Sequence, residues 1–98
     1  MSPTLDLNLI LVPSKQCTIR KQVDQYLLYH QQTDELHLLT VAAYQVYALC
    51  NGQRRVDDIL VAVSQASGDS LDSVREPLDT FLNGLIKRGI LAVEKPNV

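Results

Sequence analysis

The chain has 98 residues, of which 46% are hydrophobic and 20% are charged. This composition is that of one ordinary globular domain, and it excludes a disordered chain, a disulfide-rich scaffold and a membrane span, which needs roughly 20 consecutive apolar residues. The net charge of −2 at pH 7 argues against a nucleic-acid binder, whose affinity comes largely from basic side chains on phosphates.

Residues 1–12 are predicted to form an N-terminal arm, in a strand or extended conformation. The arm lacks the basic start and long apolar stretch of a secretory signal, so we expect a cytoplasmic protein. Pro13 interrupts it, because proline cannot donate to a sheet ladder. Alternation of apolar and polar residues then predicts three short antiparallel strands, at residues 17–21, 25–30 and 35–39.

Three helices are predicted after Thr40, at residues 41–50, 56–66 and 73–88, because apolar residues there recur at helical spacing. Thr40 is expected to cap the first helix, since its hydroxyl can accept from a free backbone N–H. Ser73 and Glu76 suggest a capping box for the third helix. Pro77 fits that helix only near its start, where a missing N–H costs least.

Three strands followed by three helices predict an α+β fold of winged helix-turn-helix character, with the three-stranded antiparallel sheet placed before the helices. Residues 13–93 are expected to form the domain. The apolar stretch 90–93 could add a further strand, and residues 94–98 are expected to be a frayed tail.

Few side chains suggest catalysis or a metal. Cys17 and Cys50 have no CxxC partner and are predicted to be reduced thiols. His30 and His37 flank a turn and could hold a metal with Cys17, but two histidines without a spacing motif favour ordinary strand residues. The Asp-Asp pair at 57–58 is expected to be first-turn helix acids. Without a phosphate loop or a hydrolase elbow, we predict a protein that is not an enzyme and holds no metal or cofactor.

A winged helix-turn-helix could instead read DNA with its last helix. In the predicted helix 73–88, however, the basic side chains are offset by acidic ones, whereas a DNA-reading helix is usually flanked by phosphate-binding Lys and Arg. The residues concerned are Arg75, Lys87 and Arg88 against Glu76 and Asp79. A DNA binder stays open as an alternative, next to a structural subunit of an enzyme complex.

The strand predicted at 35–39 suggests a different use. A strand at the edge of a sheet offers unpaired N–H and C=O groups to an incoming extended peptide. Glu35 is its only charged residue, and the last helix, if it packs nearby, would form the second wall of a groove. Two interpretations stay open: a peptide-binding edge, or an edge covered by residues 5–12 or by a second copy.

The order of several short motifs resembles a known family. The motifs are Tyr26-Leu27-Leu28-Tyr29, Glu35-Leu36-His37-Leu38-Leu39-Thr40, Asn51-Gly52, Val56-Asp57-Asp58-Ile59 and Phe81-Leu82-Asn83-Gly84-Leu85-Ile86-Lys87-Arg88-Gly89-Ile90-Leu91. Together they resemble the PqqD family, or RiPP recognition element, where RiPP means a ribosomally made and post-translationally modified peptide. The resemblance covers about residues 13–92. It departs at Thr40 and Asn51, which keep the cap and the turn, and at Arg55, where the family often has a capping Thr.

The resemblance implies a non-catalytic peptide chaperone that binds the leader segment of a precursor peptide. The leader would add as a strand beside 35–39, pack against the last helix, and be presented to a tailoring enzyme. That enzyme would be a radical S-adenosylmethionine enzyme, or a leader peptidase with a cyclase. No nucleic acid or membrane is expected as a partner. The implied peptide-binding residues are Glu35, Leu36, His37, Leu38, Leu39, Phe81, Leu82, Leu85, Lys87 and Arg88. Which alternate strand residues face the groove stays open, because a shift of one residue exchanges the two faces.

Overall fold

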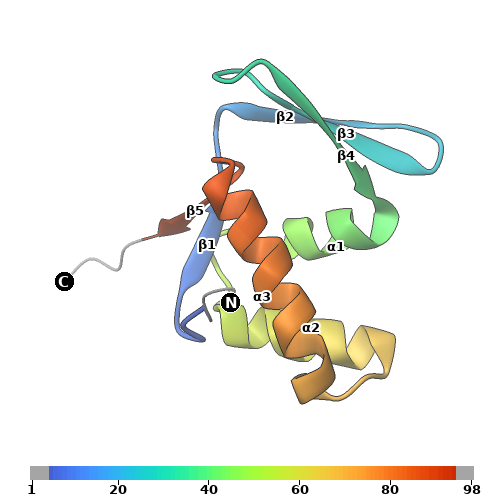
Figure 1. Ribbon diagram of the computed structural model, residues 1–98, viewed down its shortest axis with the longest axis vertical. Helices are drawn as coiled ribbons and strands as arrows, with labels where there is room; N and C mark the ends of the chain where they lie inside the picture. The colour runs from blue at the N-terminus through green and yellow to red at the C-terminus, as the bar shows by residue number, and fades with distance from the viewer. Residues whose placement is uncertain (1–4, 95–98) are drawn as a thin grey trace.

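The computed structural model describes residues 5–94 and confirms the α+β class, with a three-stranded antiparallel sheet and three helices (Figure 1). The winged helix-turn-helix likeness stays a prediction. The elements in chain order are β1 Ile10–Pro13, β2 Cys17–Lys21, β3 Gln25–His30, β4 Glu35–Thr40, α1 Val41–Leu49, α2 Val56–Ser67, α3 Leu71–Lys87 and β5 Leu91–Glu94. None of the helices within residues 5–94 is long and apolar enough to cross a membrane.

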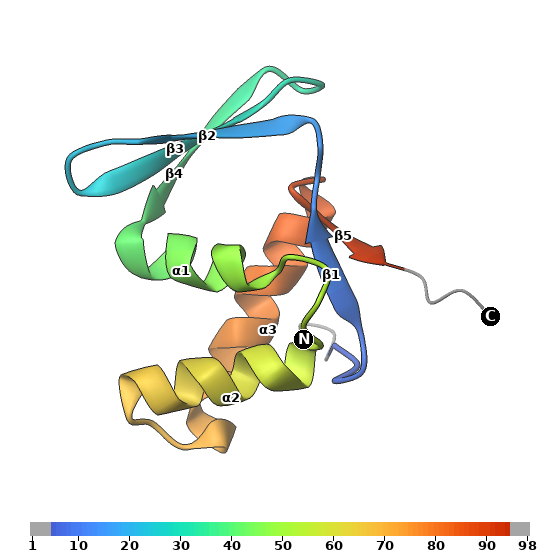
Figure 2. The same ribbon diagram turned by 180° about the vertical axis from the view of Figure 1, so that it is seen from behind.

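Two separate sheets bracket the helices. Strands β2, β3 and β4 form one sheet in that order, and β1 pairs with β5 in a second, two-stranded sheet (Figures 1 and 2). In the second sheet Ile10 pairs with Glu94 and Pro13 with Leu91. Glu94, which the sequence assigns to the frayed tail, therefore ends a paired strand, and residues 95–98 of that tail lie outside the described residues. The pairing of β1 with β5 therefore joins the first and last strands of the domain.

The core lies between α3 and the remaining elements. Its apolar residues come from all three helices, from both sheets and from the predicted arm, which contributes Leu5 and Leu11. The buried residues of α3 recur at helical spacing, as the sequence predicts. The apolar core residues are Leu5, Leu11, Leu28, Leu39, Tyr47, Cys50, Val56, Ile59, Leu60, Val74, Leu78, Leu82, Leu85, Ile90 and Leu91.

The caps of α1 and α3 show where local prediction succeeds and fails. Thr40 caps α1 as predicted, because its Oγ1 accepts from the Ala43 N–H at 3.1 Å. The predicted cap of α3 is wrong: the cap is Ser70, whose Oγ accepts from the Ser73 N–H at 3.2 Å. The preceding loop decides between the two serines, because the Asp69 backbone is bonded to the Ser64 and Ser67 hydroxyls and brings Ser70 to the helix start.

The earlier start of α3 changes the position of Pro77. Helix α3 begins at Leu71, so Pro77 lies in its second turn rather than near its start. Proline has no N–H, and the carbonyl of Ser73, four residues earlier, therefore lacks its usual helical donor.

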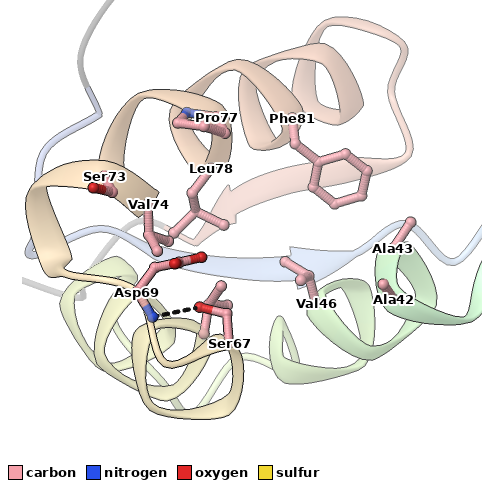
Figure 3. A pocket seen from close by; sticks show the side chains of 11 residues that line it. Ala42, Ala43, Val46, Ser67, Asp69, Ser73, Val74, Pro77, Leu78 and Phe81 are labelled. Atoms are coloured by element: carbon pink, nitrogen blue, oxygen red, sulfur yellow. Dashed lines mark hydrogen bonds between the residues drawn. The ribbon is translucent and has the colours of Figure 1, made fainter.

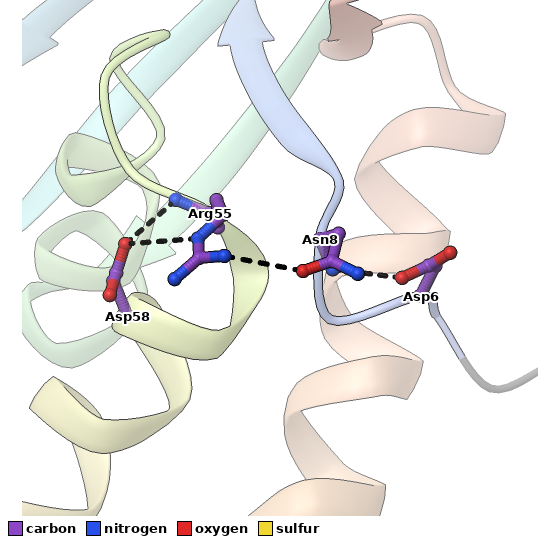
Figure 4. A network of polar contacts seen from close by, with 4 residues as sticks. All are labelled: Asp6, Asn8, Arg55 and Asp58. Carbon is purple, nitrogen blue, oxygen red and sulfur yellow. Dashed lines mark hydrogen bonds and ion pairs between the residues drawn. The ribbon is translucent and has the colours of Figure 1, made fainter.

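Helix α2 begins without a side-chain oxygen from its N-cap residue, Arg55. Asp58 compensates in part, because its Oδ2 accepts from the Arg55 N–H at 3.1 Å, and both aspartates at 57–58 lie in the first turn, as predicted. The Arg55 guanidinium donates to Asn8 Oδ1 at 3.3 Å, and the Asn8 N–H donates to Asp6 (Figure 4). These polar contacts fasten the N-terminal segment to the start of α2.

A second polar link fastens the N-terminal segment to α3. Asp79, which the sequence places among the polar residues of this helix, is 5% exposed and lies 2.9 Å from Arg75 Nε. The same guanidinium donates to the Leu5 carbonyl at 2.5 Å. Arg75 therefore has two roles: it pairs with a buried carboxylate, and it holds the N-terminal segment against α3.

We expect Arg75→Met to lower the free energy of unfolding by about 3 kcal/mol, because it leaves Asp79 buried without a partner. Urea denaturation followed by circular dichroism measures the change. The double variant Arg75→Met/Asp79→Leu should recover most of the loss, since no unpaired charge then remains. A double variant no more stable than the single one would contradict this role of the ion pair.

Candidate functional site

The strand β4 has one free edge. Its first edge pairs with β3, and no strand within residues 5–94 pairs with its second edge. The predicted alternative that residues 5–12 cover this strand is wrong, because that segment runs along β5 and the start of α2, with Leu9 O accepting from the Val56 N–H at 2.8 Å. Within residues 5–94 the edge is therefore open.

The hydrogen-bond pattern shows which backbone groups point to this free edge. Gln25 O accepts from the Gln22 N–H at 2.8 Å, so Gln25 and every second residue after it point to β2, and the residues between them point to β4. Their partners on β4 are residues 35, 37 and 39. The N–H and C=O groups of Leu36 and Leu38 consequently point away from the sheet. These two residues offer two donors and two acceptors to a further strand.

The same alternation decides which side chains face the helices. Leu39 is 6% exposed and belongs to the core, so residues 35, 37 and 39 face the helical side. Leu36 and Leu38 face the opposite side and are 67% and 63% exposed. The structure thus shows which side chains of β4 face the helices, a question that the sequence left open.

A groove of about 590 Å³ runs between β4 and α3. Seven residues that the sequence predicted as peptide-binding line it: Leu36, His37, Leu38, Leu39, Phe81, Leu85 and Arg88. The other three do not line it, because Leu82 is completely buried in the core, Lys87 is exposed beside the groove, and Glu35 begins the strand. Five further lining residues were not predicted: Thr40, Ala43, Thr80, Gly84 and Ile90. Helical spacing would have identified two of them, because Gly84 is three residues after Phe81 and Thr80 is four residues before Gly84.

His30 links the end of α3 to the sheet. It is 3% exposed, and its Nε2 lies 3.2 Å from the carbonyl of Gly89, just after α3. Its Nδ1 accepts from the Thr33 N–H at 3.4 Å, so Nε2 carries the hydrogen and donates to Gly89. Gly89 has φ of 75°, and a side chain there would begin 3.3 Å from His30 Nε2. This contact connects the sheet to the C-terminal end of α3, at one end of the groove.

The chemistry of the groove is that of binding. Its lining combines apolar side chains with nearly as much polar surface; Arg88 is exposed at one end, and the His37 ring nitrogen Nε2 is buried without a hydrogen-bond partner. Burial raises the pKa of the Cys50 thiol to about 11 and also raises the pKa of Cys17, so both thiols are protonated at neutral pH. No group of three or more metal-ligating side chains occurs in the part of the chain that the structure describes.

Comparisons with known proteins agree with the sequence motifs. The family model of coenzyme PQQ synthesis protein D, PqqD, matches residues 25–91, and the chain belongs to this family. A solved structure titled "TbiB1 in Complex with the TbiA(beta) Leader Peptide" has a similar fold, with a TM-score of 0.73 and 20% sequence identity. The similarity covers 89% of this chain and 99% of that chain. No curated protein matches the chain significantly.

Amide hydrogen exchange should reveal the free edge directly. We expect the N–H groups of Leu36 and Leu38 to exchange at least about tenfold faster than those of His37 and Leu39, which are bonded to β3. Two-dimensional nuclear magnetic resonance spectra recorded after transfer to heavy water measure the four rates. Equal protection of all four amides would show that the edge is covered in the free protein.

Proposed function

We propose that this member of the PqqD family binds the leader segment of a ribosomally made precursor peptide and presents it to a tailoring enzyme. The observation that carries the proposal is the free edge of β4, where Leu36 and Leu38 direct their backbone groups outward beside the groove formed with α3. An extended peptide satisfies such groups by adding one strand to the sheet. The family supports this role, and the similar fold of TbiB1 was solved with a leader peptide bound.

Main-chain pairing supplies affinity without much selectivity. Each hydrogen bond between the leader and Leu36 or Leu38 replaces a bond to water and contributes about 0.5–1.5 kcal/mol net. Any extended peptide without proline at the paired positions could make these bonds. Selectivity must therefore come from the side chains of the leader.

The two faces of an added strand meet different surroundings. Every second side chain of the leader would point into the groove, where Phe81 and Leu85 provide apolar contact and Arg88 provides a positive charge. The remaining side chains would lie on the outer face, next to the exposed Leu36 and Leu38. The groove face selects the leader, and the outer face leaves an apolar surface for the enzyme that receives it.

The chain itself would perform no covalent chemistry in this role. The groove holds no nucleophile beside a general base, and the Cys50 thiol is buried in the core. The receiving enzyme would be a radical S-adenosylmethionine enzyme, or a leader peptidase acting with a cyclase. The expected cytoplasmic location stays a prediction.

Proline substitutions test the docking edge. We expect Leu38→Pro to remove one outward N–H and to weaken binding of a leader peptide about three- to tenfold, because one main-chain bond is lost. Fluorescence polarisation with a labelled leader peptide measures the effect. The matched variant His37→Pro removes an N–H that points to β3, so it should lower stability instead.

Circular dichroism must show that the Leu38→Pro variant is folded before its affinity is compared. A companion variant, Leu36→Pro, tests the second outward N–H in the same way. If both folded variants bind the leader as tightly as the parent chain, β4 is not the docking edge.

The alternative functions make different predictions. At moderate salt we expect no binding of a labelled DNA duplex, because the net charge is −2 and no basic face offsets the acids of α3. We also expect the purified chain to leave the mass of its precursor unchanged on incubation. Tight duplex binding without leader binding would favour the DNA-binding alternative, and a mass change without partner enzymes would show catalysis.

A further inference from the structure

A second apolar cleft lies between the three helices. It has a volume of about 310 Å³ and lies between α1, the end of α2 and the N-terminal half of α3 (Figure 3). The apolar residues that form its walls include Ala42, Ala43, Val46, Val74, Leu78 and Phe81. An open apolar cleft of this kind in a small domain is a candidate binding surface rather than an ordinary surface irregularity.

This cleft continues the groove beside β4. Ala43 and Phe81 line both. The strand and the helix run in opposite directions, because His30 at the Glu35 end of the sheet contacts Gly89 after α3, whereas the Thr40 end leads into α1 beside Phe81. A peptide paired with β4 therefore reaches the cleft when it extends beyond Thr40.

The two ends of the continuous surface differ in charge. Asp69 lines the cleft, and Asp72 and Glu76 line the adjoining surface of α3. All three carboxylates are exposed, and the two ion pairs within the described residues, Arg55–Asp58 and Arg75–Asp79, involve none of them. Arg88 lies at the opposite end, beside the strand.

We propose that the leader extends past the Thr40 end of β4 and places a large apolar side chain in this cleft, with a basic residue next to it. The proposal rests on the proposed function, since it takes the leader as the occupant. Continuity with the groove supports this occupant, and the apolar walls and acidic rim determine which side chains fit. The cleft then selects leaders by residues that lie outside the strand-forming segment.

The test begins with a peptide selected on the protein itself. Random 18-residue peptides displayed on their messenger RNA are selected on the full chain, and those whose binding weakens in Leu38→Pro are kept as probes. Alanine scanning of a probe should identify one apolar residue outside the strand-forming segment whose loss costs about ten- to a hundredfold in affinity, as expected for burial of a large side chain.

The variant Ala42→Phe fills the cleft from an exposed position of α1, and Ala48→Phe is its matched control on the same helix, away from the cleft. We expect Ala42→Phe to weaken the probe at least about tenfold and to abolish the effect of the apolar-to-alanine change, while Ala48→Phe does neither. Probes that bind Ala42→Phe and the parent chain equally would overturn the proposal.

The acidic rim is tested with Asp72→Asn/Glu76→Gln. This variant should weaken the probe about two- to fivefold at low salt and remove the effect of replacing the basic residue of the probe, as expected for exposed charges. Asp24→Asn, in the turn between β2 and β3, is the control. An unchanged affinity would overturn the charge part of the proposal. If the selection gives no peptide that depends on Leu38, the proposed function fails instead, so the two failures are distinguishable.

Discussion

The groove depends on how α3 is held beside the sheet, by a partly buried hydrogen bond and by the shared core. His30 donates from Nε2 to the carbonyl of Gly89, at the point where α3 ends, and its other ring nitrogen accepts from the Thr33 N–H. At the opposite end Thr40 is both the last residue of β4 and the cap of α1, so the strand continues into the helix without a loop. The sheet is thus anchored to the end of α3 near one end of the groove and to α1 at the other. Such preorganisation lowers the entropic cost of binding.

An open edge strand is normally a hazard, because it can pair with other copies of the chain. Here the same open edge is the proposed binding site for the leader peptide. Strand β4 carries no charge between Glu35 and Thr40, and its outward groups belong to two leucines. The C-terminal half of α3 flanks the edge and restricts which molecule can approach.

The N-terminal segment stabilises the helical side of the groove from a distance. Leu5 and Leu11 belong to the core, β1 pairs with β5 directly after α3, and Arg75 joins Asp79 to the Leu5 carbonyl. Residues 5–13 neither line the groove nor pair with the free edge of β4. The segment's contribution to binding is therefore indirect: it holds α3, and α3 forms one wall of the groove and one wall of the helical cleft.

Much of the fold follows from local patterns in the sequence, whereas most of the site does not. The bounds of β2 and β3, the cap at Thr40 and the buried stripe of α3 depend on neighbouring residues, and the sequence determined them correctly. Ser70 caps α3 in place of Ser73 because the loop before it is held by Ser64 and Ser67, and Glu94 is paired because β1 lies beside it. The outward direction of Leu36 and Leu38 depends on the register with β3, and the burial of Leu82 beside the half-exposed Phe81 depends on how α3 is rotated against the core. Register and rotation are set by contacts between residues far apart in the chain, so only the tertiary structure decided which of the predicted residues line the groove and which others join them.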